Sequence, residues 1–119
     1  MRLAALGAIN ALVAVAAGAF GAHALKERLD AHSLEIFETG ARYQMYHALG
    51  MLAAAWLAAR GLTLAATGGW VMQGGIVVFA GSLYALALSG ERWLGAITPI
   101  GGLAMMVGWL LIALAAWRA

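Results

Sequence analysis

Cysteine is absent from this chain of 119 residues, and proline occurs only once. Without cysteine there can be no disulfide scaffold, no thiolate zinc site and no cysteine nucleophile. Charge is scarce as well, because Lys, Arg, Asp and Glu make up 10% of the residues, against about 25% in an average soluble domain. Disordered chains are polar and highly charged, so disorder is also excluded. A chain that is 65% hydrophobic and so poor in charge is typical of a membrane protein.

The few charges divide the chain into four long neutral segments, 3–25, 43–59, 61–90 and 93–117. Each can supply one helix across a bilayer core, which needs about 20 mostly apolar residues. None alternates apolar and polar residues as a barrel strand does, so helices must satisfy the backbone polar groups in lipid. We take Thr67-Gly68-Gly69 as a break in the third segment. The prediction is an all-α, integral membrane four-helix bundle, a single transmembrane domain over residues 1–119 with spans at about 3–22, 41–60, 70–89 and 98–117.

Four crossings place both termini on the same side of the membrane. Orientation follows the distribution of Lys and Arg between the short loops on the two sides. The side of the termini carries Arg2, Arg60 and Arg118, and the other side carries Lys26, Arg28, Arg42 and Arg92. Three positive charges against four do not decide the orientation.

Small residues recur at helical spacing within the neutral segments. Membrane helices pack through small residues, because lipid gives apolar side chains no drive to associate. We therefore expect the packing positions to be Gly7, Asn10, Gly18, Gly21, Gly50, Gly81, Gly101, Gly102 and Gly108. Asn10 is expected to hydrogen-bond across helices. In the third span, one face holds Gln73, Val77, Gly81, Tyr84 and Leu88, and another holds Gly75, Ser82 and Ser89, which predicts contact with two neighbouring helices.

The starts of the second and fourth helices carry recognisable local patterns. Leu34, Phe37 and Ala41 are spaced at i, i+3 and i+7 among charged residues, which predicts a charged amphipathic interfacial segment between the first two spans. Ser33 is the expected N-cap, giving a helix from about Ser33 to Arg60. The fourth helix is expected to start at Pro99 with Thr98 as its N-cap. The alternative is a helix from Leu94 that is kinked at Pro99.

Most of the remaining polarity gathers, in this helical scheme, where the first span ends and the second begins. The candidate polar or ligand-binding cluster consists of His23, Glu38, Arg42, Tyr43, Gln44 and His47. Ionisable groups inside a membrane are expensive and often functional. Three interpretations stay open: an interhelical hydrogen-bond knot, a pocket for a lipid or small ligand, and proton or metal chemistry. A metal would need His23 and His47 to converge with a third ligand, which their spacing does not enforce, so we assign no metal and expect no cofactor.

No catalytic constellation is visible, because the chain has no nucleophile–base pair, P-loop or dinucleotide fingerprint. We therefore expect that the protein is not an enzyme. The net charge is only +2 and no basic patch occurs, so nucleic acid is not an expected partner. The expected partners are membrane lipid and either a second copy of the chain or another membrane protein.

Four ordered stretches resemble a known family. They are 18–25 (GAFGAHAL), 37–40 (FETG) with 43–49 (YQMYHAL), 81–84 (GSLY), and 97–102 (ITPIGG) with 108–109 (GW). In this order they resemble the small membrane proteins of the YgdD type, catalogued as domain of unknown function 423. The resemblance implies a four-span bacterial inner-membrane protein with no assigned catalytic residues. Family members often have more basic termini, which favours termini in the cytoplasm.

The function predicted from sequence is that of a small integral inner-membrane protein of unknown activity. We expect a structural or accessory helical bundle that self-associates or packs with a partner. The alternative is a carrier, channel-like or ligand-binding protein that uses the polar cluster around His23 and His47.

Overall fold

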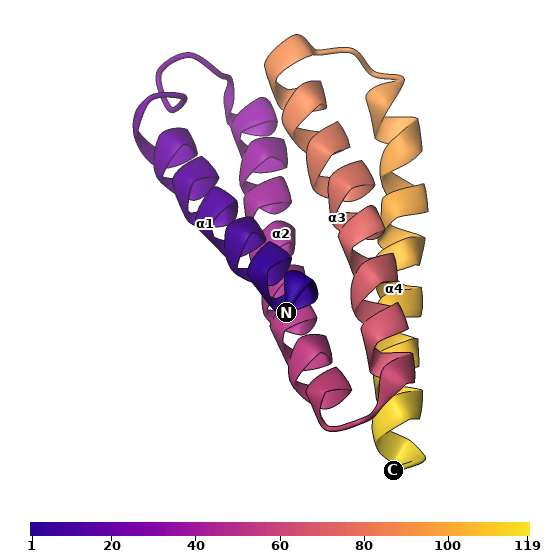
Figure 1. Cartoon of the computed structure of the whole chain (residues 1–119). Helices are drawn as coiled ribbons and strands as arrows, with labels where there is room; N and C mark the ends of the chain where they lie inside the picture. The colour runs from indigo at the N-terminus through magenta and orange to yellow at the C-terminus, as the bar shows by residue number, and fades with distance from the viewer.

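The computed structural model describes residues 1–119, which form four helices and no strand. They are α1 (Arg2–His23), α2 (Ala31–Ala59), α3 (Thr63–Ser89) and α4 (Leu94–Trp117). Consecutive helices run in opposite directions, so loops 24–30 and 90–93 lie at one end of the molecule (Figure 1). The turn at 60–62 and both termini lie toward the other end. The predicted all-α bundle is confirmed.

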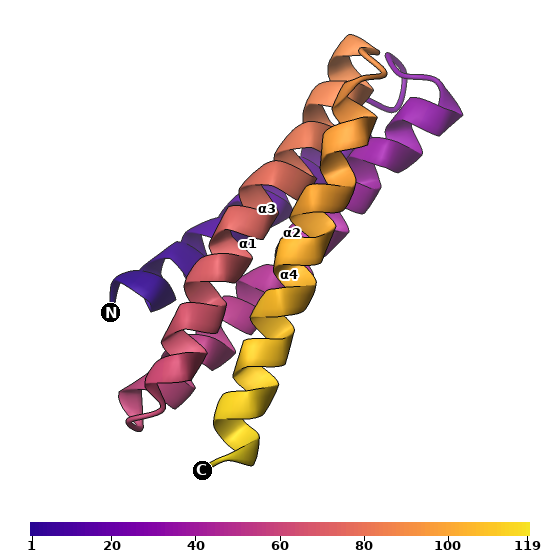
Figure 2. The same ribbon diagram turned by 90° about the vertical axis from the view of Figure 1, so that its right-hand side faces the viewer.

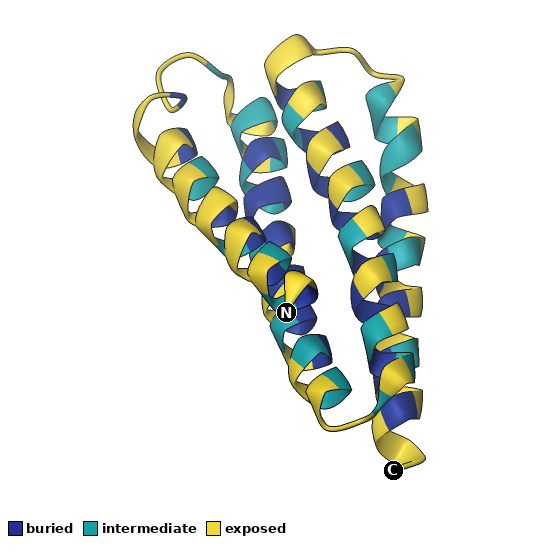
Figure 3. Ribbon diagram, viewed as in Figure 1, coloured by how far each residue is buried: buried dark blue, intermediate teal, exposed yellow.

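The helices pack in chain order and do not close into a ring. α1 packs on α2, α2 on α3, and α3 on α4, whereas α1 and α4 do not contact each other. The quarter-turn view places α4 and α1 on opposite sides of the molecule (Figure 2). α3 therefore keeps an outward face between its neighbours, as the exposed positions along it show (Figure 3).

Three of the four helices, α1, α3 and α4, are long and apolar enough to cross a membrane. α2 is the longest, with 29 residues, but it is not among the three. Its first half carries the charged residues that precede Tyr43 and the polar residue Gln44, and His47 follows just past the midpoint. The amphipathic segment lies in this half, where Phe37 and Ala41 are buried and Glu35 is exposed.

The start of α2 corrects the predicted cap. The N-cap is Asp30, not Ser33, and the Asp30 carboxylate accepts a hydrogen bond of 2.7 Å from the backbone N–H of Ser33. Both residue types cap helices well, and the aspartate is placed so that its carboxylate reaches the third N–H of the first turn. This hydrogen bond holds the pKa of Asp30 below its ordinary value. Since the pKa is lowered, the cap is intact at neutral pH and is lost only as the pH falls through that lowered value.

The predicted break at Thr67-Gly68-Gly69 is wrong, because α3 runs through it without interruption. Both glycines are positions of close helix packing. A Cβ at Gly68 would lie 2.8 Å from the carbonyl oxygen of Gly108, and one at Gly69 would lie 2.6 Å from Leu3. Gly68 and Gly69 are thus accommodated in the helix by contacts with α4 and α1 that the local sequence does not reveal.

The fourth helix begins at Leu94, so the expected start at Pro99 is wrong and the alternative start is confirmed. The backbone N–H groups of Leu94, Gly95 and Ala96 already bond to the carbonyls of 91–93, which begins the helix before the proline. Pro99 removes only the bond that its N–H would make to the Gly95 carbonyl. The hydroxyl of Thr98, rather than capping, lies 2.6 Å from that of Ser82 and joins α4 to α3.

Glycines at matching positions bring α3 and α4 together. Gly68 lies against Gly108, and Gly75 lies against Gly101, so the pairs are seven residues apart on each antiparallel helix. A Cβ on any of the four would meet backbone atoms of the facing helix closely. The two backbones therefore approach through residues without side chains, which is how membrane helices gain packing contacts.

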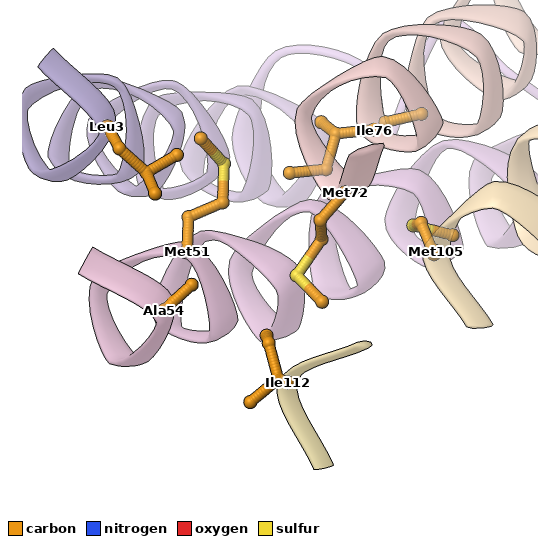
Figure 4. Packing of buried hydrophobic residues seen from close by; sticks show 8 residues of the cluster. Leu3, Met51, Ala54, Met72, Ile76, Met105 and Ile112 are labelled. Carbon is orange, nitrogen blue, oxygen red and sulfur yellow. The ribbon is translucent and has the colours of Figure 1, made fainter. Parts of the chain in front are cut away.

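The largest buried cluster takes residues from all four helices and extends through the middle of the bundle. Its members are Leu3, Met51, Ala54, Met72, Ile76, Ala80, Met105 and Ile112, most of them labelled in Figure 4. The cluster depends on flexible methionines, which fill the irregular gaps left between small residues. A second, smaller cluster of Leu25, Phe37 and Ala87 packs the loop at 24–30 against α2 and α3.

Replacing Gly75 with alanine tests the close approach of α3 and α4. The added Cβ would lie 2.6 Å from Met105 Cγ and 2.9 Å from the Gly101 carbonyl oxygen, so the helices must separate. We expect the free energy of unfolding in mixed micelles to fall by about 1–3 kcal/mol. Gly18→Ala is the control, because nothing lies within 4 Å of a Cβ there. It should leave stability unchanged or raise it by up to about 1 kcal/mol; equal losses in both variants would contradict the account.

Candidate functional site

A chain of hydrogen-bonded polar side chains joins three helices inside the bundle. The Tyr84 hydroxyl of α3 donates to Gln44 Oε1 of α2 over 2.7 Å. Gln44 Nε2 donates to Asn10 Oδ1 of α1 over 3.0 Å, and Asn10 Nδ2 donates to Gln73 Oε1 of α3 over 2.6 Å. Asn10 and Gln44 are buried, with 7% and 6% of their surfaces exposed. The predicted interhelical bonding of Asn10 is confirmed.

The donor-to-acceptor direction of this series of hydrogen bonds is fixed by the backbone of α1. Asn10 Nδ2 also donates to the carbonyl oxygen of Leu6 over 2.9 Å. A carbonyl oxygen can only accept, so the amide of Asn10 must present its nitrogen there and its oxygen to Gln44. Gln44 must then turn its own oxygen toward Tyr84. Each side-chain amide in this series of hydrogen bonds thus has one orientation that satisfies its neighbours.

The Gln73 and Tyr84 partners were not predicted, although both residues were placed on one face of the third span. Three other residues of that face, Val77, Gly81 and Leu88, are exposed, so the predicted contact of this face with a neighbouring helix is wrong for these three. The side of α3 toward α2 is instead formed by Met72 and Leu83, among others, beside Gly50 and Gly40. Long side chains allow Gln73 and Tyr84 to reach inward from the edge of the face, which spacing alone does not show.

His47 lies apart from this chain, on the side of α2 toward α4. Its Nδ1 lies 2.7 Å from the Tyr43 carbonyl oxygen, one turn earlier in the helix. The ring stacks on the Tyr43 ring with centroids 6.1 Å apart and lies 5.8 Å from the Trp109 ring of α4. His47 is 6% exposed and forms part of the wall of a crevice of ≈ 420 Å³ between α2, α3 and α4.

The other members of the predicted cluster lie elsewhere. His23 is exposed at the end of α1, Glu38 is half-buried, and Arg42 is exposed and donates to the Thr39 hydroxyl over 3.3 Å. Gly21 of α1 lies against Phe37, and His47 is ten residues further along α2, about 15 Å at 1.5 Å per residue. His23 and His47 therefore do not converge, and no three His, Asp or Glu side chains gather as metal ligands.

The predicted packing glycines divide into two groups. Gly7, Gly21, Gly50, Gly101 and Gly108 are buried against a neighbouring helix, and Gly102 makes ordinary contact with the Phe79 ring. Gly18 and Gly81 contact nothing within 4 Å of a Cβ position, because their sides of α1 and α3 face outward. The predictions that Gly18 and Gly81 pack against another helix are therefore wrong for contacts within one chain.

Every fully buried side-chain nitrogen or oxygen atom has a hydrogen-bond partner within the protein. The fold and its interior therefore define a small all-helical integral membrane protein in which hydrogen bonds between side-chain amides hold the helices in place. The chain matches, over residues 17–102, the model of a family described as protein of unknown function (DUF423). It belongs to this family of membrane proteins, as the four sequence stretches predicted.

Relatives confirm this membership along almost the whole chain. The UPF0382 membrane protein YwdK of Bacillus subtilis is 50% identical over 113 residues, which cover 93% of this chain and 92% of the relative. The UPF0382 membrane protein SSP2132 of Staphylococcus saprophyticus is 47% identical, with 95% and 94% covered. The chain is a small membrane protein of the same kind. No solved structure matches it.

Removing one hydroxyl tests the polar chain. Tyr84→Phe keeps the ring, which packs 4.8 Å from that of Phe37, but leaves Gln44 Oε1 without its donor. We expect a loss of about 1 kcal/mol in the free energy of unfolding in mixed micelles, since interhelical hydrogen bonds in membranes average about 0.6 and reach about 1.7 kcal/mol. Tyr46→Phe is the matched control, because Tyr46 is exposed and has no such bond. Equal stability of the Tyr84→Phe variant and the unmodified protein would show that the hydrogen bond from Tyr84 to Gln44 does not stabilise the bundle.

Proposed function

We propose that this protein is a non-enzymatic accessory protein of the bacterial inner membrane that acts by assembling with a second copy of itself. The surface proposed for assembly is the outward face of α3, defined here by Trp70, Gly74, Val77 and Gly81. All four residues are exposed in the single chain. The proposal rests on two properties of this face: two of its residues are glycines, and a side-chain amide at its edge has an unpaired nitrogen.

Two glycines lie on this face with empty space above them. Gly74 and Gly81 are seven residues apart, so they occupy the same side of α3, and nothing lies within 4 Å of a Cβ built on either. Glycine is a weak helix former, so exposed glycines lower the stability of an isolated helix. In membranes such positions let the backbone of another helix approach closely. A partner helix on this face would give the glycines a packing role that they lack in the single chain.

The observation that carries the proposal is the amide nitrogen of Gln73. Gln73 Oε1 accepts from Asn10, but Nε2 has no partner within the chain. Because no buried side-chain nitrogen is left unpaired, Nε2 must be accessible at the surface. Lipid offers no hydrogen-bond acceptor in its hydrocarbon core, where an unpaired polar group costs several kcal/mol. A two-fold partner would bring the acceptors of an identical helix to this edge.

The interior supports an accessory role over transport or catalysis. Asn10 and Gln44, which could line a polar passage, are bonded to neighbouring helices. A carrier would need such groups free to exchange partners with a solute. No nucleophile lies beside a base among the bonds of the interior, which favours a protein without catalytic chemistry.

The same proposal includes four membrane crossings with both termini in the cytoplasm. α2 packs between α1 and α3, and it begins and ends at opposite ends of the bundle (Figure 1). Its polar side chains Gln44 and His47 face other helices, so α2 can cross although its composition is too polar for a helix facing lipid alone. The family resemblance supports the orientation. A cysteine introduced at Ala119 should react with an impermeant maleimide only from the cytoplasmic side.

Single cysteines test the proposed interface directly, because the chain has none of its own. A two-fold axis along the membrane normal brings each residue of the α3 face near its own copy. We expect Gly74→Cys and Gly81→Cys to form disulfide-linked dimers on mild oxidation in liposomes that hold few protein molecules each. The readout is the dimer fraction on a non-reducing gel.

Cysteines on the outer helices serve as controls for random collision. Leu12→Cys on α1 and Leu110→Cys on α4 replace residues that are 68% and 57% exposed, so they meet other molecules freely in the membrane. They should remain mostly monomeric under the same oxidation. Cross-linking at Leu12→Cys or Leu110→Cys as efficient as at Gly81→Cys would contradict assembly through α3.

A further inference from the structure

The crevice beside His47 has the form of a binding site that opens within the apolar part of the helices. Three helices form its wall, and the residues used below are Tyr43 and His47 of α2, Phe79 of α3, and Gly102 and Met106 of α4. Its volume is ≈ 420 Å³, which falls in the range of small-molecule sites. No Lys, Arg, Asp or Glu lines it. A molecule that enters must therefore be largely apolar and come from the membrane.

One hydrogen-bond acceptor remains free in this apolar surrounding. His47 Nδ1 lies 2.7 Å from the Tyr43 carbonyl oxygen, and a carbonyl can only accept, so Nδ1 carries the hydrogen. A charged imidazole without a counter-ion is costly in an apolar surrounding, so the neutral form is favoured, in which Nε2 holds a lone pair and acts as an acceptor. Nε2 has no partner in the protein, yet no buried side-chain nitrogen lacks one, so Nε2 is accessible from outside. The crevice is the opening to which His47 contributes.

Aromatic rings lie next to this imidazole, and those of Tyr43 and Phe79 line the crevice and favour a flat ligand. The Tyr43 ring stacks on the imidazole at 18° and lies 5.0 Å from the Phe79 ring, and Trp109 lies on the other helix at 5.8 Å from His47. Aromatic side chains bind planar rings by offset or edge contacts. Met106 adds a flexible side chain that adapts to the shape of a ligand.

We propose that this crevice binds a quinol, a flat aromatic diol with an apolar tail, through a hydroxyl that donates to His47 Nε2. The shared chemistry is a hydroxyl donor on an apolar body, and a lipid alcohol such as diacylglycerol has it too. The ring-lined wall favours the quinol. Binding alone is proposed, with no electron or proton transfer.

This site is independent of the assembly face. Phe79 follows Gly74 by five residues, which places it about 140° away around α3, toward α4. A second copy on the outward face of α3 would leave the crevice open. Failure of self-association therefore does not affect the ligand site, and the reverse also holds.

The test compares a reduced ligand with its oxidised form in lipid nanodiscs that contain the full chain. Decyl-ubiquinol, kept reduced under nitrogen, has hydroxyl donors, whereas decyl-ubiquinone has acceptor oxygens but no donor. Loss of the donated hydrogen bond should weaken binding about fivefold for the quinone. Nitrogen NMR of the three histidines should show a shift at His47 Nε2 on quinol addition, with His23 and His32 unchanged.

Two variants identify the site. His47→Leu removes the acceptor and should reduce the affinity for quinol about fivefold, to that for quinone. Gly102→Leu leaves His47 in place and fills the crevice, since a Cβ there would sit at an ordinary 3.7 Å from the Phe79 ring. It should abolish quinol binding, while Gly18→Leu, on an open outer surface, should not change it.

Three results would overturn the proposal. They are equal affinity for quinol and quinone, unchanged quinol binding in the folded Gly102→Leu variant, and a shift of His47 Nε2 caused by diacylglycerol but not by quinol. The last would assign the crevice to a lipid alcohol. Tighter binding of quinol that Gly102→Leu abolishes would establish the site.

Discussion

The need to pair amide groups where no water is present determines how α1, α2 and α3 meet. Asn10 lies near the middle of α1, with its two donors and its acceptor directed to Leu6, Gln73 and Gln44. In a soluble protein a misplaced amide could turn to water. Inside a bilayer it cannot, so any shift of one helix along another would leave an unpaired group. The chain of bonds from Tyr84 to Gln73 thereby fixes the relative positions of three helices.

Small residues let the helices approach closely enough for these bonds, and glycines bring α4 against α3. The backbone of α4 lies against that of α3 through Gly68, Gly75, Gly101 and Gly108, with the hydroxyl pair of Ser82 and Thr98 further along. Lipid gives no hydrophobic drive to associate, so close contact and a few polar bonds must hold the helices together. α4 is held mainly by contact, and the crevice at His47 lies along its border with α2.

Much of the fold follows from the sequence because the bilayer restricts the choices. Long neutral segments and small-residue faces predicted the helices, and Asn10 was expected to bond across them. The failures have a common physical origin, which is tertiary contact. Gly68 and Gly69 resemble a break until Gly108 and Leu3 are seen against them. Pro99 resembles a helix start until the backbone bonds before it are known.

The polar cluster was predicted only in part. Gln44 and His47 are buried as expected for functional or structural polar groups, but they face different helices and have different roles. His23 was grouped with them because the first span ends near the start of the second. A helix rises about 1.5 Å per residue, so nearness in a loop says little about His47, which lies well inside α2. The partners Gln73 and Tyr84 could not be assigned without knowing how α3 is rotated.

A double-mutant cycle between Asn10 and Gln44 tests most directly whether the amide chain holds the helices. The free energies of unfolding of Asn10→Leu, Gln44→Leu and the double variant would be measured by reversible denaturation in mixed micelles. The account predicts that the double variant loses about 1 kcal/mol less than the sum of the single variants, because each single variant already breaks the shared bond. Losses that add to within about 0.3 kcal/mol would contradict the account.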